Sequence, residues 1–250
     1  MTATPDRAPA PVAPGGESGP PNASRQPRRA PVRGARPLPP GGRARRRLLA
    51  AGATLPAVGL AAILLWRPGA PRNTFDHSLL VPVREAVWAS GVVDGLLTAL
   101  ALAAFALAGC VLVRGRGRAW VDGGAVLLLV GAPLAASGPF AFGVLVWYAG
   151  DPAFSGSATT LLETVRADIG PLYGPVAAGT VLAGLGTLAV CVGLWRADRV
   201  GRVLPVALAV TTVLVFAVPS GRLTDVVQAL QLLLVAAVGA TLLGVREERW

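Results

Sequence analysis

Residues 87–118 read VWASGVVDGLLTALALAAFALAGCVLVRGRGR, an apolar run from Val87 to Val113 that ends in three closely spaced arginines. A helix rises about 1.5 Å per residue, so about 20 apolar residues cross a hydrocarbon core of about 30 Å. The run is long enough to cross, and an arginine cluster is typical of a cytoplasmic flank. This stretch therefore predicts a membrane-spanning helix whose C-terminal end faces the cytoplasm.

Five more apolar segments have the same character. They run Leu48–Trp66, Gly123–Tyr148, Pro171–Trp195, Leu204–Val218 and Val226–Val245. Only 14% of the residues are charged and the mean hydropathy is +0.59, which excludes an ordinary soluble domain. We therefore expect an all-α fold, a polytopic membrane bundle of six transmembrane helices.

Arginine clusters fix the expected orientation. They comprise Arg43 to Arg47, Arg114 to Arg118, Arg196 to Arg202, and Arg246 with Arg249, and a six-helix reading places all of them on one side. By the positive-inside bias this side is cytoplasmic, so we expect a multi-pass cell-membrane protein with both termini in the cytoplasm. The chain has no lysine and is rich in alanine, glycine, valine and leucine, which indicates a GC-rich bacterial genome.

The chain divides into three parts by composition. Residues 1–47 are rich in proline, glycine and arginine and predict a disordered cytoplasmic tail, residues 48–245 form the transmembrane domain, and residues 246–250 form a short cytoplasmic tail. The cluster Arg43, Arg45, Arg46 and Arg47 has two interpretations. It either contacts anionic lipid head groups at the cytoplasmic face or acts only as a topology signal.

Short sequence matches suggest an internal repeat. Ser78-Leu79-Leu80 is echoed by Thr160-Leu161-Leu162, and Leu107-Ala108 by Leu188-Ala189. Three parallel helical hairpins would explain these matches, although short matches also arise by chance in so repetitive a sequence. The outer connections 67–86 and 150–170 each predict a short interfacial helix with its leucines on one face.

Seven polar residues form a candidate solute pathway among the apolar segments. They are Asp94, Thr98, Ser137, Thr211, Thr212, Gln228 and Gln231. Asp94 lies about 28 Å along its helix from Val113, near the outer membrane boundary, where it either lines a pathway or pairs with an arginine such as Arg84 or Arg166. The other six either line a polar vestibule or form hydrogen bonds between helices.

Two apolar segments contain residues that affect helix geometry or packing. Pro133 and Pro139 predict a kink or break in the third apolar segment, because neither has an amide hydrogen. The fourth segment contains two pairs of small residues, and the members of each pair are four apart. These are Gly170, Gly174, Gly179 and Ala183, and they predict close helix packing against a helix of this chain or of a second copy.

Catalytic and cofactor chemistry have little support in this composition. Two cysteines and one histidine cannot assemble the common zinc or iron–sulfur sites, so we expect no metal and no cofactor. Ala136-Ser137-Gly138 resembles the setting of the nucleophile in intramembrane serine proteases. The only histidine, His77, lies in an outer connection, so we expect no catalytic residues. The basic charge is accounted for by orientation, and we expect no nucleic-acid partner.

Two functions remain open after these exclusions. The first is a non-enzymatic membrane protein that transports or binds a small solute along the seven polar residues. The second is an assembly or accessory subunit that packs against a membrane partner, or against a second copy, through its glycine-rich helix.

Overall fold

The computed structural model describes residues 40–66, 76–198, 200–219 and 221–244, and these are helical apart from short turns. Five long helices and the shorter α7 form the body of the protein. They are α1 (Pro40–Trp66), α3 (Arg84–Leu112), α4 (Arg118–Ala149), α6 (Gly170–Ala197), α7 (Val203–Ala217) and α8 (Arg222–Gly244). Shorter elements connect them: α2 (His77–Leu80), η1 (Val81–Val83), η2 (Pro152–Phe154) and α5 (Ser155–Ala167). The all-α prediction is confirmed.

The predicted six-span count is not confirmed in full. Five helices are long and apolar enough to cross a membrane, whereas α7 has only 15 residues. It begins at Val203 and ends at Ala217. The next residue, Val218, is extended because it directly precedes Pro219, and a proline disfavours helical conformations of the residue before it. At about 1.5 Å per residue α7 is about 22 Å long, which is shorter than a hydrocarbon core of about 30 Å.

The first helix begins earlier than the composition suggests. α1 starts at Pro40, so residues 40–47 are helical although they belong to the tail that we expected to be disordered. Proline is favourable in the first turn of a helix and arginine is a good helix former. Arg46 and Arg47 are described, but the side chains of Arg43 and Arg45 are not, and residues 1–39 and 245–250 lie outside the described ranges.

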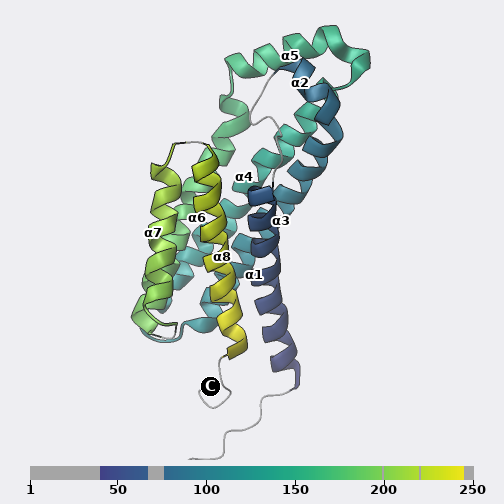
Figure 1. Ribbon diagram of the computed structural model, residues 1–250. Helices are drawn as coiled ribbons and strands as arrows, with labels where there is room; N and C mark the ends of the chain where they lie inside the picture. Colours follow the sequence, from purple (N-terminus) through teal and green to yellow (C-terminus); the bar gives the residue numbers. More distant parts are fainter. Residues whose placement is uncertain (1–39, 67–75, 199, 220, 245–250) are drawn as a thin grey trace, which may run out of the picture. The chain divides into compact units, whose positions relative to one another are not determined.

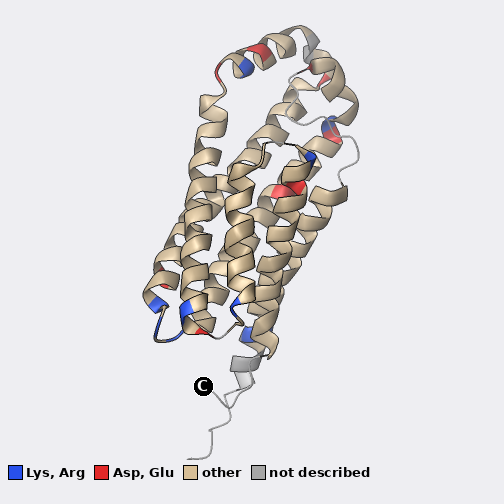
Figure 2. Cartoon of the chain, turned by 60° about the vertical axis from the view of Figure 1, so that its left-hand side comes forward, with Lys and Arg blue, Asp and Glu red and all other residues tan. Residues whose placement is uncertain are grey.

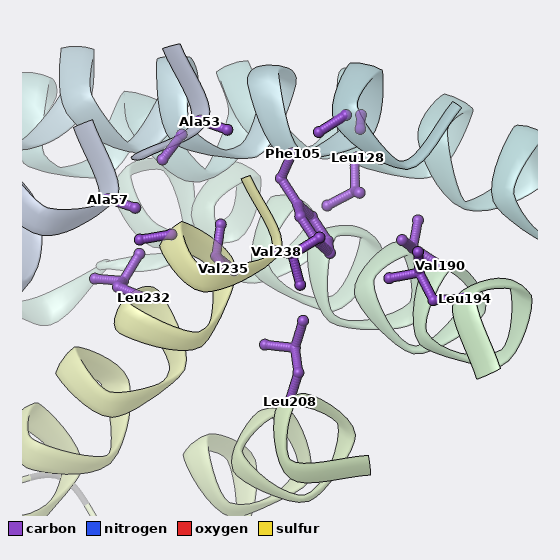
Figure 3. Packing of buried hydrophobic residues seen from close by; sticks show 14 of the residues in the cluster. Ala53, Ala57, Phe105, Leu128, Val190, Leu194, Leu208, Leu232, Val235 and Val238 are labelled. Carbon is purple, nitrogen blue, oxygen red and sulfur yellow. The ribbon is translucent and has the colours of Figure 1, made fainter. Parts of the chain in front are cut away.

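The long helices pack side by side in a closed order (Figure 1). Each contacts the next along the chain, from α1 to α3, α4, α6, α7 and α8, and α8 returns to α1. The most extensive contacts are those of α4 with α6 and with α3. Phe105 of α3 is fully buried among Leu128, Val190, Leu208 and Val238, which come from four other helices (Figure 3).

Glycines at a spacing of seven hold α4 against α6. One series comprises Gly117, the N-cap of α4, and Gly124 and Gly131 within the helix. The other series runs antiparallel to it along α6 and comprises Gly193, Gly186 and Gly179. A Cβ on Gly124 would lie 2.7 Å from the carbonyl oxygen of Gly186, closer than real Cβ atoms come. Seven residues are about two helical turns, so each series stays on one face. The two backbones therefore touch along this line.

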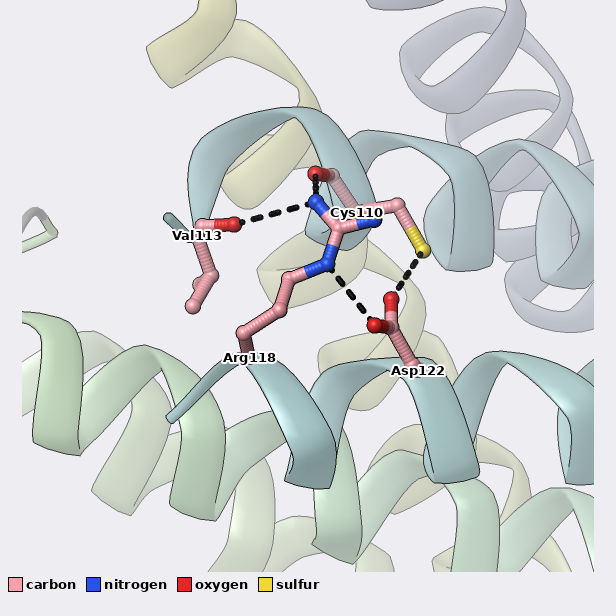
Figure 4. Close-up of polar contacts among 4 residues, drawn as sticks. All are labelled: Cys110, Val113, Arg118 and Asp122. Atoms are coloured by element: carbon pink, nitrogen blue, oxygen red, sulfur yellow. Dashed lines mark hydrogen bonds and ion pairs between the residues drawn. The ribbon is translucent and has the colours of Figure 1, made fainter. Parts of the chain in front are cut away.

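The connection between α3 and α4 is closed by Arg118 (Figure 4). Its guanidinium donates to the Cys110 carbonyl oxygen at 2.8 Å and to the Asp122 carboxylate at 2.8 Å. A cation is favourable at a helix C-terminus, where the last carbonyl groups have no partner within the helix. Arginines gather at this end of the bundle, which also carries the connection between α6 and α7 (Figure 2).

The three-hairpin repeat is not confirmed. The pairs α1–α3, α4–α6 and α7–α8 each pack together, but short helices occur in the first two connections and the third is a brief turn. α5 confirms the helix that we expected within residues 150–170, and α2 is a single turn.

Candidate functional site: an apolar groove on α3 and α4

A groove of about 980 Å³ lies between α3 and α4 and is open on one side. This volume is at the upper end of the range of about 300–1,000 Å³ that is typical of small-molecule pockets. Its lining comes mainly from α4, with one residue from α5. The lining residues are Gly95, Leu96, Ala99, Pro133, Ala136, Ser137, Phe140, Ala141, Val144, Leu145, Tyr148 and Leu161. None of them is charged.

Small residues create this groove between two helices that otherwise touch. At Gly91 and Gly95 the α3 backbone approaches α4 so closely that a Cβ would collide with the Pro139 carbonyl oxygen or the Phe140 ring. Ala99 and Ala141 lie near this contact and fill little space, whereas the larger side chains of Leu96 and Phe140 remain partly exposed. The groove therefore has small residues at its base and large apolar side chains at its rims.

Helix α5 closes one end of the groove. Leu162 and Ala158 of α5 are buried in a cluster with Leu80 and Val146, and this cluster fixes α5 against α2 and α4. The preceding residue, Leu161, lies on another face of the helix and contributes to the groove. The interfacial helix that we expected here thus packs on protein and also lines a candidate site.

An ion pair and two tryptophans reinforce the same end. Arg84 lies 3.2 Å from the Asp151 carboxylate, and its guanidinium lies over the Trp147 ring at 5.0 Å. The Trp88 and Trp147 rings are 5.4 Å apart. The pKa of Asp151 is held below its ordinary value of 3.8, first by a hydrogen bond from the Ala153 amide and then by Arg84. These contacts join the start of α3 to the end of α4.

Ser137 is the one residue of the expected polar pathway that lines the groove. Its hydroxyl donates to the Leu134 carbonyl oxygen at 2.6 Å, within its own helix. α4 runs without a break from Arg118 to Ala149, and Pro133 and Pro139 lie inside it.

Three other pathway residues form hydrogen bonds on α7 and α8. The Gln231 side-chain amide donates to the Thr212 hydroxyl at 2.9 Å, and Thr212 donates in turn to the Leu208 carbonyl oxygen at 2.7 Å. Thr211 donates to carbonyl oxygens of its own helix, including that of Leu208 at 3.0 Å. Gln231 and Thr212 thus form a hydrogen bond between α8 and α7, which is the alternative to lining a polar vestibule.

The remaining pathway residues lie apart from the groove lining. Asp94 is buried on α3, next to the groove residue Gly95, and Thr98 and Gln228 are half-buried on α3 and α8. Arg84, one expected partner of Asp94, forms its ion pair with Asp151, and Arg166 is exposed on α5. Asp225 is a second buried carboxylate, in the first turn of α8, where the helix dipole favours negative charge.

The face of α6 that packs against α4 differs in part from the predicted face. Gly179 and Ala183 are buried against α4, but Gly170 and Gly174 are exposed, and a Cβ on Gly174 would meet nothing within 4 Å. The packing line continues instead through Gly186 and Gly193. A spacing of four changes face gradually along a helix, whereas the observed spacing of seven follows one face for longer.

Within the described ranges, no three metal-binding side chains gather at one place, and Cys110 and Cys191 are both thiols. The groove itself was missed in the sequence, since its alanines do not stand out in so alanine-rich a chain. Comparison with protein-family models, with curated proteins and with solved structures finds no match to this chain.

Proposed function

We propose that this protein is a non-enzymatic, multi-pass membrane protein that binds a small apolar solute in the groove between α3 and α4. The observation that carries the proposal is the groove itself, with a volume of about 980 Å³ and no charged lining residue. Apolar lining with a few polar groups is the usual character of small-molecule sites. The solute would enter from the side, because the groove opens along the helices that have membrane-spanning length.

Binding in the groove is better supported than passage of a polar solute through the bundle. A polar pathway needs side chains that can turn toward the solute, and Thr211, Thr212 and Ser137 all donate to carbonyl oxygens of their own helices. Gln231 donates across to Thr212. Among the polar candidates only Ser137 reaches the groove, so the groove is an apolar site.

The arginine-rich end supports a cytoplasmic location for the α3–α4 and α6–α7 connections. Arg114, Arg116, Arg118, Arg196 and Arg202 all lie at this end. At the other end, arginines are accompanied by Asp151, Glu163 and Asp168. The positive-inside bias then puts α5 and the closed end of the groove outside, and Arg46 and Arg47 near anionic cytoplasmic head groups.

The alternative role as an assembly subunit has weaker support. It relied on a glycine-rich face of α6 that a partner could contact. That face is covered by α4 of the same chain, since Gly179, Gly186 and Gly193 all lie against it. The exposed Gly170 and Gly174 stand near the end of α6, where the contact area would be small.

Photolabelling with a small aryl diazirine tests the proposal on the full chain in liposomes. We expect labels to accumulate on the segment 133–148, and Ala141→Phe to reduce them by filling the groove. The matched control is Ala240→Phe, which makes the same change at an exposed position of α8 away from the groove. Equal labelling of 133–148 in both variants, with the same thermal midpoint, would contradict the proposal.

A further inference from the structure

We infer that the occupant of this groove is one acyl chain of a membrane phospholipid, taken from the leaflet on the α5 side. This inference rests on the proposed function and names its ligand. The first argument is position. The groove is formed by residues 95–99 and 133–148, which lie inside two helices of membrane-spanning length, and it is open on one side. The medium at that opening is therefore the hydrocarbon of the bilayer.

The second argument is length. Along α4 the lining runs from Pro133, near the middle of Arg118–Ala149, to Tyr148 at its end. At about 1.5 Å per residue this distance is about 22 Å. Half of a hydrocarbon core of about 30 Å, together with part of the head-group region, has this thickness. A chain aligned with its neighbours in one leaflet would fill the groove along its length, whereas a compact solute would occupy only part of it.

The third argument is the distribution of polar groups. In the deeper part the lining is apolar except for Ser137, whose hydroxyl is engaged by the Leu134 carbonyl oxygen. A second hydroxyl, that of Tyr148, lies at the end of α4, where an interfacial tyrosine is typical. The groove is thus apolar at depth and more polar toward the surface. A phospholipid has the same order, from the chain end to its ester groups.

The fourth argument concerns the head group. No lining residue is charged, so nothing in the groove selects between anionic and zwitterionic phospholipids. Leu161 of α5 lies at the surface end, and α5 is fixed there by Leu162 and Ala158. The head group would therefore lie beside α5. The charged residues of α5 beside the head group, Glu163 and Arg166, have opposite signs. We conclude that recognition depends on the hydrocarbon chain, and that phosphatidylcholine and phosphatidylglycerol occupy the groove equally well.

The test uses the full chain in liposomes that contain a phospholipid with a diazirine near the end of one acyl chain. We expect crosslinks on residues 133–140 in excess of those on the exposed Leu230 and Leu233 of α8. A diazirine near the ester group should instead mark the region of Tyr148 and Leu161. Both probes should give the same pattern on a phosphatidylcholine and on a phosphatidylglycerol scaffold.

The variants separate this inference from the proposed function. Ala141→Phe should abolish the excess of phospholipid crosslinks and Ala240→Phe should leave it unchanged, with Ala99→Leu as a second filling variant if Ala141→Phe does not fold. If the small aryl diazirine labels the groove but the phospholipid probes label it no more than α8, the phospholipid assignment is wrong and the proposed function stands. If neither probe favours the groove, both are wrong. A strong preference for one head group would overturn the argument from the uncharged lining.

Discussion

Gly124 of α4 and Gly186 of α6 lie backbone against backbone. A Cβ added to Gly124 would lie 2.7 Å from the Gly186 carbonyl oxygen, and one added to Gly186 would lie 2.8 Å from the Gly124 carbonyl oxygen. The contact is reciprocal, so neither helix can yield by turning a side chain. The most extensive helix pair of the protein therefore depends on the absence of two methyl groups.

Gly124→Ala should consequently destabilise the bundle. Overpacking of a tight contact typically costs about 1–3 kcal/mol, which exceeds the gain of up to about 1 kcal/mol from the better helix propensity of alanine. We expect a lower thermal midpoint for the detergent-solubilised protein. Gly123→Ala is the matched control, because a Cβ there meets nothing within 4 Å, and its midpoint should be unchanged or higher. Equal midpoints for the two variants would show that α4 and α6 can separate without cost.

The glycine series shows what the sequence could have revealed. Gly117, Gly124 and Gly131 are seven apart, as are Gly179, Gly186 and Gly193, and both series are visible without coordinates. A search for a spacing of four selects Gly170 and Gly174, which are exposed, together with Gly179 and Ala183, which are buried. The sequence could indicate that two helices have glycine faces. It could not indicate that these faces meet, because that depends on how the six helices are ordered around the bundle.

The hydrogen bond between Gln231 and Thr212 gives a second prediction. Hydrogen bonds between transmembrane helices average about 0.6 kcal/mol and reach about 1.7 kcal/mol. In a double-mutant cycle of Gln231→Leu and Thr212→Val, unfolding in a denaturing detergent should give a coupling energy within this range. The cycle of Gln228→Leu with Thr212→Val is the control and should be additive. Additivity in both cycles would mean that the bond contributes nothing to the packing of α7 on α8.

Acidification should loosen the end of the bundle that α5 covers. The pKa of Asp151 is depressed in the folded protein, so its contribution to stability is complete above the ordinary value of 3.8 and is lost as the pH falls through the lower, folded value. Hydrogen exchange of α5, or the fluorescence of Trp147 beside Arg84, should therefore change below about pH 4. Asp151→Asn should weaken this pH dependence, and Asp168→Asn, at an exposed position of the same connection, should retain it.

The helices were predictable and the groove was not, for one physical reason. A long apolar segment in a membrane has no water to bind its backbone polar groups, so it forms a helix that satisfies them internally. Helices such as α3 and α6 therefore match their predicted ranges within a few residues. The groove instead depends on the rotation of α3 against α4. Ala99 and Ala141 line it only because Gly91 and Gly95 bring the two backbones together nearby.

The short helix α7 gives the last prediction. It lies alongside α6 and α8 and runs from the arginine-rich end to the start of α8, although its 15 residues are too few for a full hydrocarbon core (Figure 1). A short apolar helix can still cross where the bilayer thins locally. We expect it to cross, so that Gly201 before α7 is cytoplasmic and Leu223 after α7 is outside.

Cysteine substitution in a chain without Cys110 and Cys191 tests this expectation in intact cells. Gly156→Cys on α5 and Leu223→Cys should react with an impermeant reagent, and Gly201→Cys only after permeabilisation. Gly156 and Gly201 suit the purpose because a Cβ at either meets nothing within 4 Å, whereas Gly117 has φ of 91° and lies against the Gly193 carbonyl oxygen. Protection of both Gly201→Cys and Leu223→Cys would mean that α7 does not cross and that five helices span the membrane. Labelling of Gly201→Cys without permeabilisation would reverse the orientation that the arginines indicate.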